Sequence, residues 1–174
     1  MLEKCLFKLK DRKGFTLIEL LIVIAIIAII ASVVFVALDP LTRFREARDT
    51  NRWSNIASIL NAIKVDQVDN RGSYLSAISN MTSGLVYMIV DGAVSSGCDD
   101  QNAYCDTDVS GDSNCVNLAG LVNEGYLGDV PVSPNGLGTW SSSITGYTLT
   151  ASSSGIISVR ACESENSDEI WLAK

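Results

Sequence analysis

The chain has 174 residues and a formal net charge of −7, with 13 basic residues, 20 acidic residues and no histidine. An acidic chain argues against a general nucleic-acid-binding surface, which would be basic. The sequence contains no P-loop, no Gly-x-Gly-x-x-Gly and no Gly-x-Ser-x-Gly motif, and with no histidine it gives no sign of an enzyme.

The two ends of the chain carry opposite charge. Residues 1–14 contain five basic and two acidic residues, a net charge of +3, whereas the remaining 160 residues contain eight and eighteen, a net charge of −10. The positive-inside rule keeps the basic end in the cytoplasm and places the acidic part outside. The length suits one domain plus a membrane segment.

Residues 15–38 form an apolar run of 24 residues in which only Glu19 is charged. As a helix this run would be about 36 Å long, which is enough to cross the apolar core of a bilayer. A charge within such a helix is costly, so it usually has a partner or a function. A plain single-pass anchor would leave Glu19 unexplained.

Residues 13–20, Lys-Gly-Phe-Thr-Leu-Ile-Glu-Leu, follow a short basic leader and resemble the processing site of class III signal peptides. That site is the signature of type IV pilins and of the pseudopilins of type II secretion. The resemblance implies that a prepilin peptidase removes residues 1–14 by cleaving after Gly14 on the cytoplasmic side, and then N-methylates Phe15. It also implies that Glu19 pairs with the N-terminal amine of a neighbouring subunit as a filament grows.

Residues 39–72 are predicted to continue the helix on an amphipathic pattern. Pro40 is expected to kink the helix, and the spacing of Trp53, Ile56, Leu60 and Ile63 indicates an apolar face. Asn70-Arg71-Gly72 is a typical C-terminal signal, so the predicted helix has about 55 residues. Four arginines lie near the start of this segment, either on a solvated neck or against acidic patches of neighbouring subunits: Arg43, Arg45, Arg48 and Arg52.

Residues 73–174 are predicted to form an extracytoplasmic globular head. Residues 85–90 suit a strand, and residues 116–136 a short helix followed by a turn. Residues 147–151 and 156–162 suit two antiparallel strands joined by a hairpin loop at 152–155. The resemblance implies an α+β, pilin-like fold in which the long helix packs on a small antiparallel sheet.

Five cysteines occur, and Cys5 would be lost with the leader. The even number that remains outside the membrane suits two disulfides, with three possible connectivities. Free buried thiols or metal ligation are the alternatives. A zinc site is poorly supported, because there is no Cys-x-x-Cys pair and no histidine. The disulfide candidates are Cys98, Cys105, Cys115 and Cys162.

The segment between these cysteines contains half of an EF-hand-like calcium pattern, formed by Asp106, Asp108, Ser110 and Asp112. The twelfth position is Asn117 instead of the bidentate glutamate, so a disulfide-held acidic loop is the favoured interpretation. By resemblance to major pseudopilins, Glu165, Asp168 and Glu169 form a second calcium candidate, against a solvated acidic tail. No other cofactor is expected.

The leading hypothesis is a structural subunit that polymerises into a type IV pilus or a type II secretion pseudopilus. The implied partners are copies of the same chain, other pilin-like subunits, a prepilin peptidase, an assembly platform in the membrane and membrane lipid. The protein would begin as a single-pass inner-membrane protein and end in an extracellular or periplasmic filament. The alternative is a monomeric, membrane-anchored binding or receptor protein.

Overall fold

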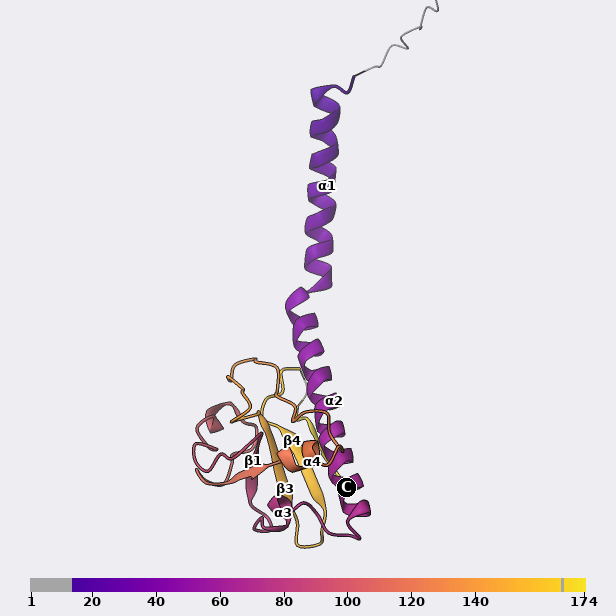
Figure 1. Ribbon diagram of the computed structural model, residues 1–174. Helices are drawn as coiled ribbons and strands as arrows, with labels where there is room; N and C mark the ends of the chain where they lie inside the picture. The colour runs from indigo at the N-terminus through magenta and orange to yellow at the C-terminus, as the bar shows by residue number, and fades with distance from the viewer. Residues whose placement is uncertain (1–13, 167) are drawn as a thin grey trace, which may run out of the picture. The chain divides into compact units, whose positions relative to one another are not determined.

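The computed structural model describes residues 14–166 and 168–174 (Figure 1). The predicted leader therefore lies outside the described residues, apart from Gly14. The chain divides into two units, Met1–Pro40 and Leu41–Lys174. The first contains helix α1 (Leu17–Leu38). The other elements are α2 (Pro40–Asp69), α3 (Ser76–Ser79), β1 (Val86–Val90), the 3-10 helix η1 (Asn102–Tyr104), β2 (Cys115–Asn117), α4 (Ala119–Asn123), β3 (Tyr147–Ala151), β4 (Ile157–Ala161) and β5 (Trp171–Ala173).

Helix extends from Leu17 to Asp69 with one interruption at Asp39. Asp39 adopts a left-handed conformation, with φ 36° and ψ 73°. Proline disfavours the helical conformation in the residue before it and has no N–H to donate to the preceding turn. Pro40 therefore interrupts the helix one residue before itself, and α2 begins at the proline.

Helix α2 ends in a Schellman motif. The Gly72 N–H donates to the carbonyl of Gln67 at 2.7 Å, and the Arg71 N–H donates to that of Val68 at 3.4 Å. Arg71 takes the left-handed position of the motif, with φ 57°. These bonds satisfy carbonyls that the last helical turn leaves without partners, so the helix stops three residues before the predicted boundary at residue 72.

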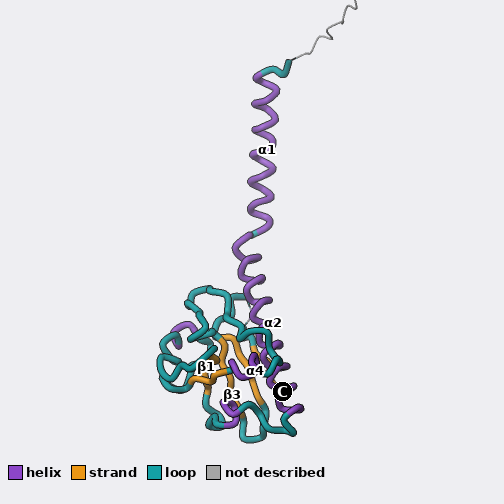
Figure 2. The backbone as a smooth tube through the Cα atoms, in the orientation of Figure 1, coloured by secondary structure: helices purple, strands orange, loops and turns teal. Residues whose placement is uncertain are grey.

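Five strands form one sheet in the order β2-β1-β3-β4-β5. The predicted hairpin is present, because β3 and β4 pair antiparallel over five residues each. β1 and β2, in contrast, pair parallel, with Met88 opposite Cys115. The predicted α+β class is confirmed, but the sheet is mixed instead of antiparallel. Its parallel partner β2 lies in the segment that the sequence suggested was a loop, and long loops connect the strands (Figure 2).

The core of the second unit lies between α2 and the sheet, with α3 and α4 completing it. Ile56, Ile59 and Ile63 of α2 are fully buried. Trp53, which falls on the predicted apolar face, is 38% exposed. The buried face of α2 is therefore rotated slightly from the predicted one.

All four cysteines outside the leader are paired, as Cys98–Cys115 and Cys105–Cys162. This is one of the three connectivities that the sequence allowed. The bonds lie against a second apolar cluster that contains Met88, Val90, Val109 and Trp140. Chain-entropy estimates for loops of this length are about 3 to 4 kcal/mol per bond, which compensates for a small core.

Candidate processing and assembly site

The start of α1 is held by hydrogen bonds between Thr16 and Glu19. The backbone N–H and the hydroxyl of Thr16 donate to Oε2 of Glu19 at 2.9 and 2.7 Å, and the Glu19 N–H donates to the Thr16 hydroxyl at 3.3 Å. This is a capping box, in which two side chains satisfy backbone donors that the first turn leaves free. Glu19 therefore has a local structural role before any neighbouring subunit is present.

Gly14 and Phe15 precede the helix in backbone that has no regular structure. The side chain of Phe15 is 85% exposed, and a Cβ atom placed on Gly14 would find no atom within 4 Å. The peptide bond between these two residues is therefore flanked by exposed residues on both sides. It lies one residue before the cap, so cleavage would leave the helix intact.

Helix α1 exposes apolar side chains on every face. None of its residues is buried, and its large apolar side chains are 46–82% exposed. The one polar side chain in its middle, Ser32, donates its hydroxyl to the carbonyl of Ile29 at 2.8 Å. Among the described residues, one helical stretch, Leu17–Asp69 with its interruption at Asp39, is long and apolar enough to span a bilayer. Such a surface requires lipid or other apolar helices around it.

The second unit contains a buried charge cluster centred on Arg52, which is 0% exposed. The guanidinium group makes five hydrogen bonds, and an arginine has five N–H groups to donate. Nε donates to Ser133, Nη1 to Asp49 and Glu165, and Nη2 to Glu163 and the carbonyl of Pro134, at 2.8–3.2 Å. Arg52 therefore ties α2 to two distant segments of the head.

Glu163 and Asp49 are the buried acceptors of this cluster. Glu163 accepts from the N–H groups of Leu137 and Gly138 and from the indole Nε1 of Trp140. Asp49 accepts from the backbone N–H groups of Glu165 and Asn166. Buried charges are tolerated when they are paired and hydrogen-bonded. The cluster therefore fixes residues 163–166 against α2.

The sequence pattern alone does not predict this cluster: it places the four arginines on a solvated neck or against neighbouring subunits, and residues 163–169 in a solvated acidic tail. Arg43, which pairs with Glu46, is indeed exposed. Arg48 and Arg52 turn inward instead, to Glu165 of the same chain. One signal was present: counting back from Ile63, Ile59 and Ile56 at helical spacing reaches Arg52, so the buried face of α2 continues through this arginine.

Glu165 links Arg48 and Arg52. The hydrogen bonds from Arg48 lower the pKa of Glu165 from its usual 4.5 to about 2, Arg52 adds to this effect, and burial opposes it. Because the pKa is lower in the folded state, this carboxylate contributes stability above about pH 4.5 and loses it as the pH falls toward 2.

We therefore expect Glu165→Gln to weaken the fold at neutral pH and to remove part of the acid-induced loss of stability. The measurement is urea unfolding of the mature protein in detergent between pH 2 and 7, with exposed Glu124→Gln as the control. If Glu165→Gln and the parent lose stability equally between pH 4.5 and 2, the charge pairing of Glu165 is wrong.

Three residues of the predicted calcium half-motif, Asp106, Ser110 and Asp112, have different hydrogen-bond partners. The hydroxyl of Ser164 donates to Asp106, whose pKa is raised by burial against the opposing effect of this bond. Ser110 accepts from the Val86 N–H at 2.9 Å, and Asp112 accepts from the Gly97 N–H at 2.6 Å. Of the second candidate set, Glu165 pairs with Arg48 and Arg52, and Glu169 pairs with Arg160.

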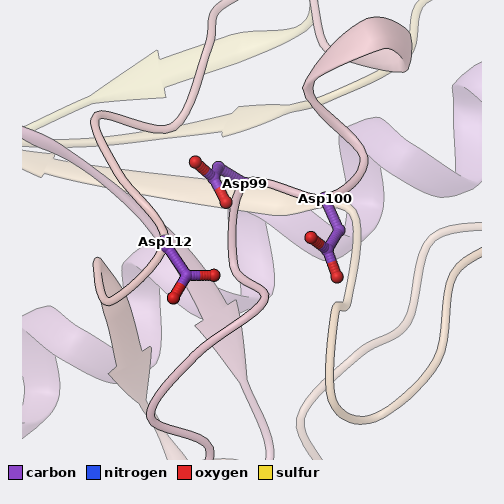
Figure 3. A group of neighbouring side chains, drawn as sticks. All are labelled: Asp99, Asp100 and Asp112. Atoms are coloured by element: carbon purple, nitrogen blue, oxygen red, sulfur yellow. The ribbon is translucent and has the colours of Figure 1, made fainter.

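Within the described residues, three carboxylates do approach one another in the disulfide-held loop: Asp99, Asp100 and Asp112 (Figure 3). One oxygen of each lies within 4.8 Å of the others, and two of the three residues are exposed. Asp112 alone belongs to the predicted half-motif. Calcium binding stays a prediction, for which this trio offers three carboxylate oxygens.

Comparison with known proteins returned a family model for the prokaryotic N-terminal methylation motif, which matches residues 9–35. The match covers the predicted cleavage site, the capping box of Thr16 and Glu19, and most of α1. Comparisons with curated proteins and with solved structures gave no match.

Proposed function

From the N-terminal methylation motif, which is the signal motif of type IV pilins and pseudopilins, we propose that this chain is a structural subunit of a pilus or pseudopilus. The observation that carries the proposal is the combination of this motif with a following helix that is apolar on every face apart from Glu19. A helix of this kind suits two successive environments, the bilayer and a bundle of identical helices.

Processing is the first step of the proposed function. A prepilin peptidase hydrolyses the exposed peptide bond after Gly14, and the new α-amine of Phe15 receives a methyl group. The five basic residues of the leader are removed in this step. The mature subunit then remains in the membrane, with its head on the outer side.

Assembly is the second step. The subunit leaves the bilayer for the growing filament, where contacts between apolar helices replace contacts with lipid. In these apolar surroundings the Glu19 carboxylate pairs with the N-terminal amine of a neighbouring subunit. Opposite charges about 4 Å apart attract by about 4 kcal/mol at an effective dielectric constant of 20, so the pair fixes the position of one helix against the next.

The mass of the mature protein tests processing. We expect cells that contain a prepilin peptidase to yield a chain that begins at Phe15 and carries one extra methyl group, measured by mass spectrometry of the intact protein. Gly14→Val is the matched control, because it leaves α1 unchanged and places a branched side chain at the cleaved bond.

An intact leader on the parent protein in those cells would contradict the proposal. It would favour the alternative of a monomeric, membrane-anchored binding protein. Equal cleavage of the parent and of Gly14→Val would show that the peptidase does not recognise this bond as proposed.

A further inference from the structure

The first turns of α2, together with one loop of the head, expose apolar and basic side chains. Leu41, Phe44 and Leu137 are 68%, 63% and 84% exposed. The side chain of Arg43 is 71% exposed, and Arg45 lines the same surface hollow as Leu137, of about 290 Å³. These five residues are called the neck patch here.

Hydrogen bonds of the backbone fix Leu137 in this exposed position. Its backbone N–H and that of Gly138 donate to the buried Glu163, at 2.5 and 2.7 Å. Glu163 is fixed in turn by Arg52 and Trp140. A large apolar side chain on a fixed loop, beside a helix that exposes further apolar side chains, is a typical feature of an interaction surface.

In the part of the chain that the structure describes, the two arginines of the neck patch form no ion pair with the acidic residues that bind Arg48 and Arg52. Arg48 and Arg52, further along the same helix, form ion pairs with Glu165. Arg45 forms no ion pair or hydrogen bond with any residue in the described ranges 14–166 and 168–174, and Arg43 pairs with Glu46, which is itself exposed. Arginines of this kind bind phosphate groups readily.

We propose that the neck patch binds the phospholipid headgroup layer on the outer side of the membrane. Leu41, Phe44 and Leu137 enter the boundary with the acyl chains, and Arg43 and Arg45 bind lipid phosphates. Phe and Leu side chains are typical of the apolar face of interfacial helices, and basic side chains extend toward the headgroups. The inference rests on the membrane anchoring in the proposed function.

Chain length supports lipid as the occupant. Leu41 is three residues from Leu38, the last residue of α1, so it lies at most about 11 Å from it. The headgroup layer on each side of a bilayer is about 5 to 7 Å thick, and α1 with 22 residues is about 33 Å long against an apolar core of about 30 Å. The start of α2 is therefore within reach of the headgroups.

The patch also supplies basic residues after α1, whereas processing removes the basic residues before it. All five basic residues on the cytoplasmic side lie in residues 1–13 and are lost on cleavage after Gly14. The nearest basic side chains that remain are Arg43 and Arg45. The neck patch therefore sets the depth of the processed helix in the membrane.

Spin labels on single cysteines test this surface in the mature full-length chain, reconstituted in nanodiscs of phosphatidylcholine and phosphatidylglycerol. The native cysteines of the mature chain are paired, so an introduced cysteine is the free thiol that reacts. The variants are Phe44→Cys in the patch, Ala28→Cys within α1 and Ser54→Cys on an exposed position of α2. A spin label that lies in lipid is accessible to oxygen, and a spin label that lies in water is accessible to a nickel chelate.

We expect position 44 to resemble position 28, with a high ratio of oxygen to nickel accessibility, and position 54 to show the reverse. If position 44 resembles position 54 while position 28 stays in lipid, the patch proposal is overturned and the anchoring stands. If position 44 is shielded from both reagents and shows spin–spin broadening that dilution with unlabelled protein removes, a second copy covers the patch and the proposal is likewise overturned. If position 28 is in water, the membrane anchoring in the proposed function fails as well.

The arginines are tested separately in the Phe44→Cys background. Arg43→Gln with Arg45→Gln is expected to lower the oxygen-to-nickel ratio at position 44 in nanodiscs that contain phosphatidylglycerol. Arg71→Gln, an exposed arginine at the far end of α2, is the control and should leave the ratio unchanged. Equal ratios in all three proteins would overturn the role of lipid phosphates.

Discussion

Arg52→Ala is expected to destabilise the second unit by about 3 to 5 kcal/mol, because removing one partner of a buried ion pair leaves the other charges buried without compensation. Arg52 is fully buried, and the variant would leave the buried Asp49 and Glu163 without their guanidinium partner. The loss is a large part of the 5 to 15 kcal/mol by which a domain of this kind is usually stable.

Urea unfolding of the mature protein in detergent, followed by tryptophan fluorescence, measures this effect. Arg43→Ala is the matched control, since it removes an exposed pair on the same helix and should cost no more than about 1 kcal/mol. If Arg52→Ala unfolds within 1 kcal/mol of the parent, the cluster does not hold residues 163–166 to α2 as we describe.

Glu19→Ala is expected to insert into the membrane normally and to abolish filament formation. Removing a charge from a membrane helix makes insertion more favourable, so the defect should arise in assembly. Two effects of the substitution need separating. It removes the charge that pairs with a neighbouring amine, and it removes the acceptor of the capping box with Thr16.

Two further variants separate these effects. Glu19→Gln keeps an oxygen that accepts from Thr16 but removes the charge, whereas Thr16→Val removes the hydroxyl of the cap and keeps the charge. Loss of a cap costs about 1 kcal/mol, much less than an unpaired charge in apolar surroundings. We expect Glu19→Gln to block filaments, counted by electron microscopy, and Thr16→Val to reduce them slightly. The reverse order would show that Glu19 acts through the cap.

The first unit could be predicted almost entirely from sequence. Its features depend on local chemistry: an apolar run long enough for a bilayer, a single carboxylate three residues after Thr16, and a proline that interrupts the helix. A helix in lipid satisfies its own backbone hydrogen bonds, so no distant residue is needed to specify it. The hairpin of β3 and β4 was predictable for a similar reason, since its strands are separated by five residues.

The pairings between distant segments were decided by the tertiary structure. Considered alone, Arg52 and Glu163 are charged residues of the kind that usually face solvent. They form a buried ion pair because the fold brings together two residues that are 111 positions apart in the sequence. The same holds for the parallel pairing of β2 with β1 and for the choice among three disulfide connectivities.

Sequence by itself therefore predicted the membrane helix and the processing site, because both depend on one short continuous segment. Tertiary structure decided which arginines are buried to fasten the head to α2 and which stay exposed in the neck patch. The physical reason is that burial is a property of position in the fold: four arginines within ten residues have the same chemistry, and the acidic residues of a distant segment meet two of them, Arg48 and Arg52.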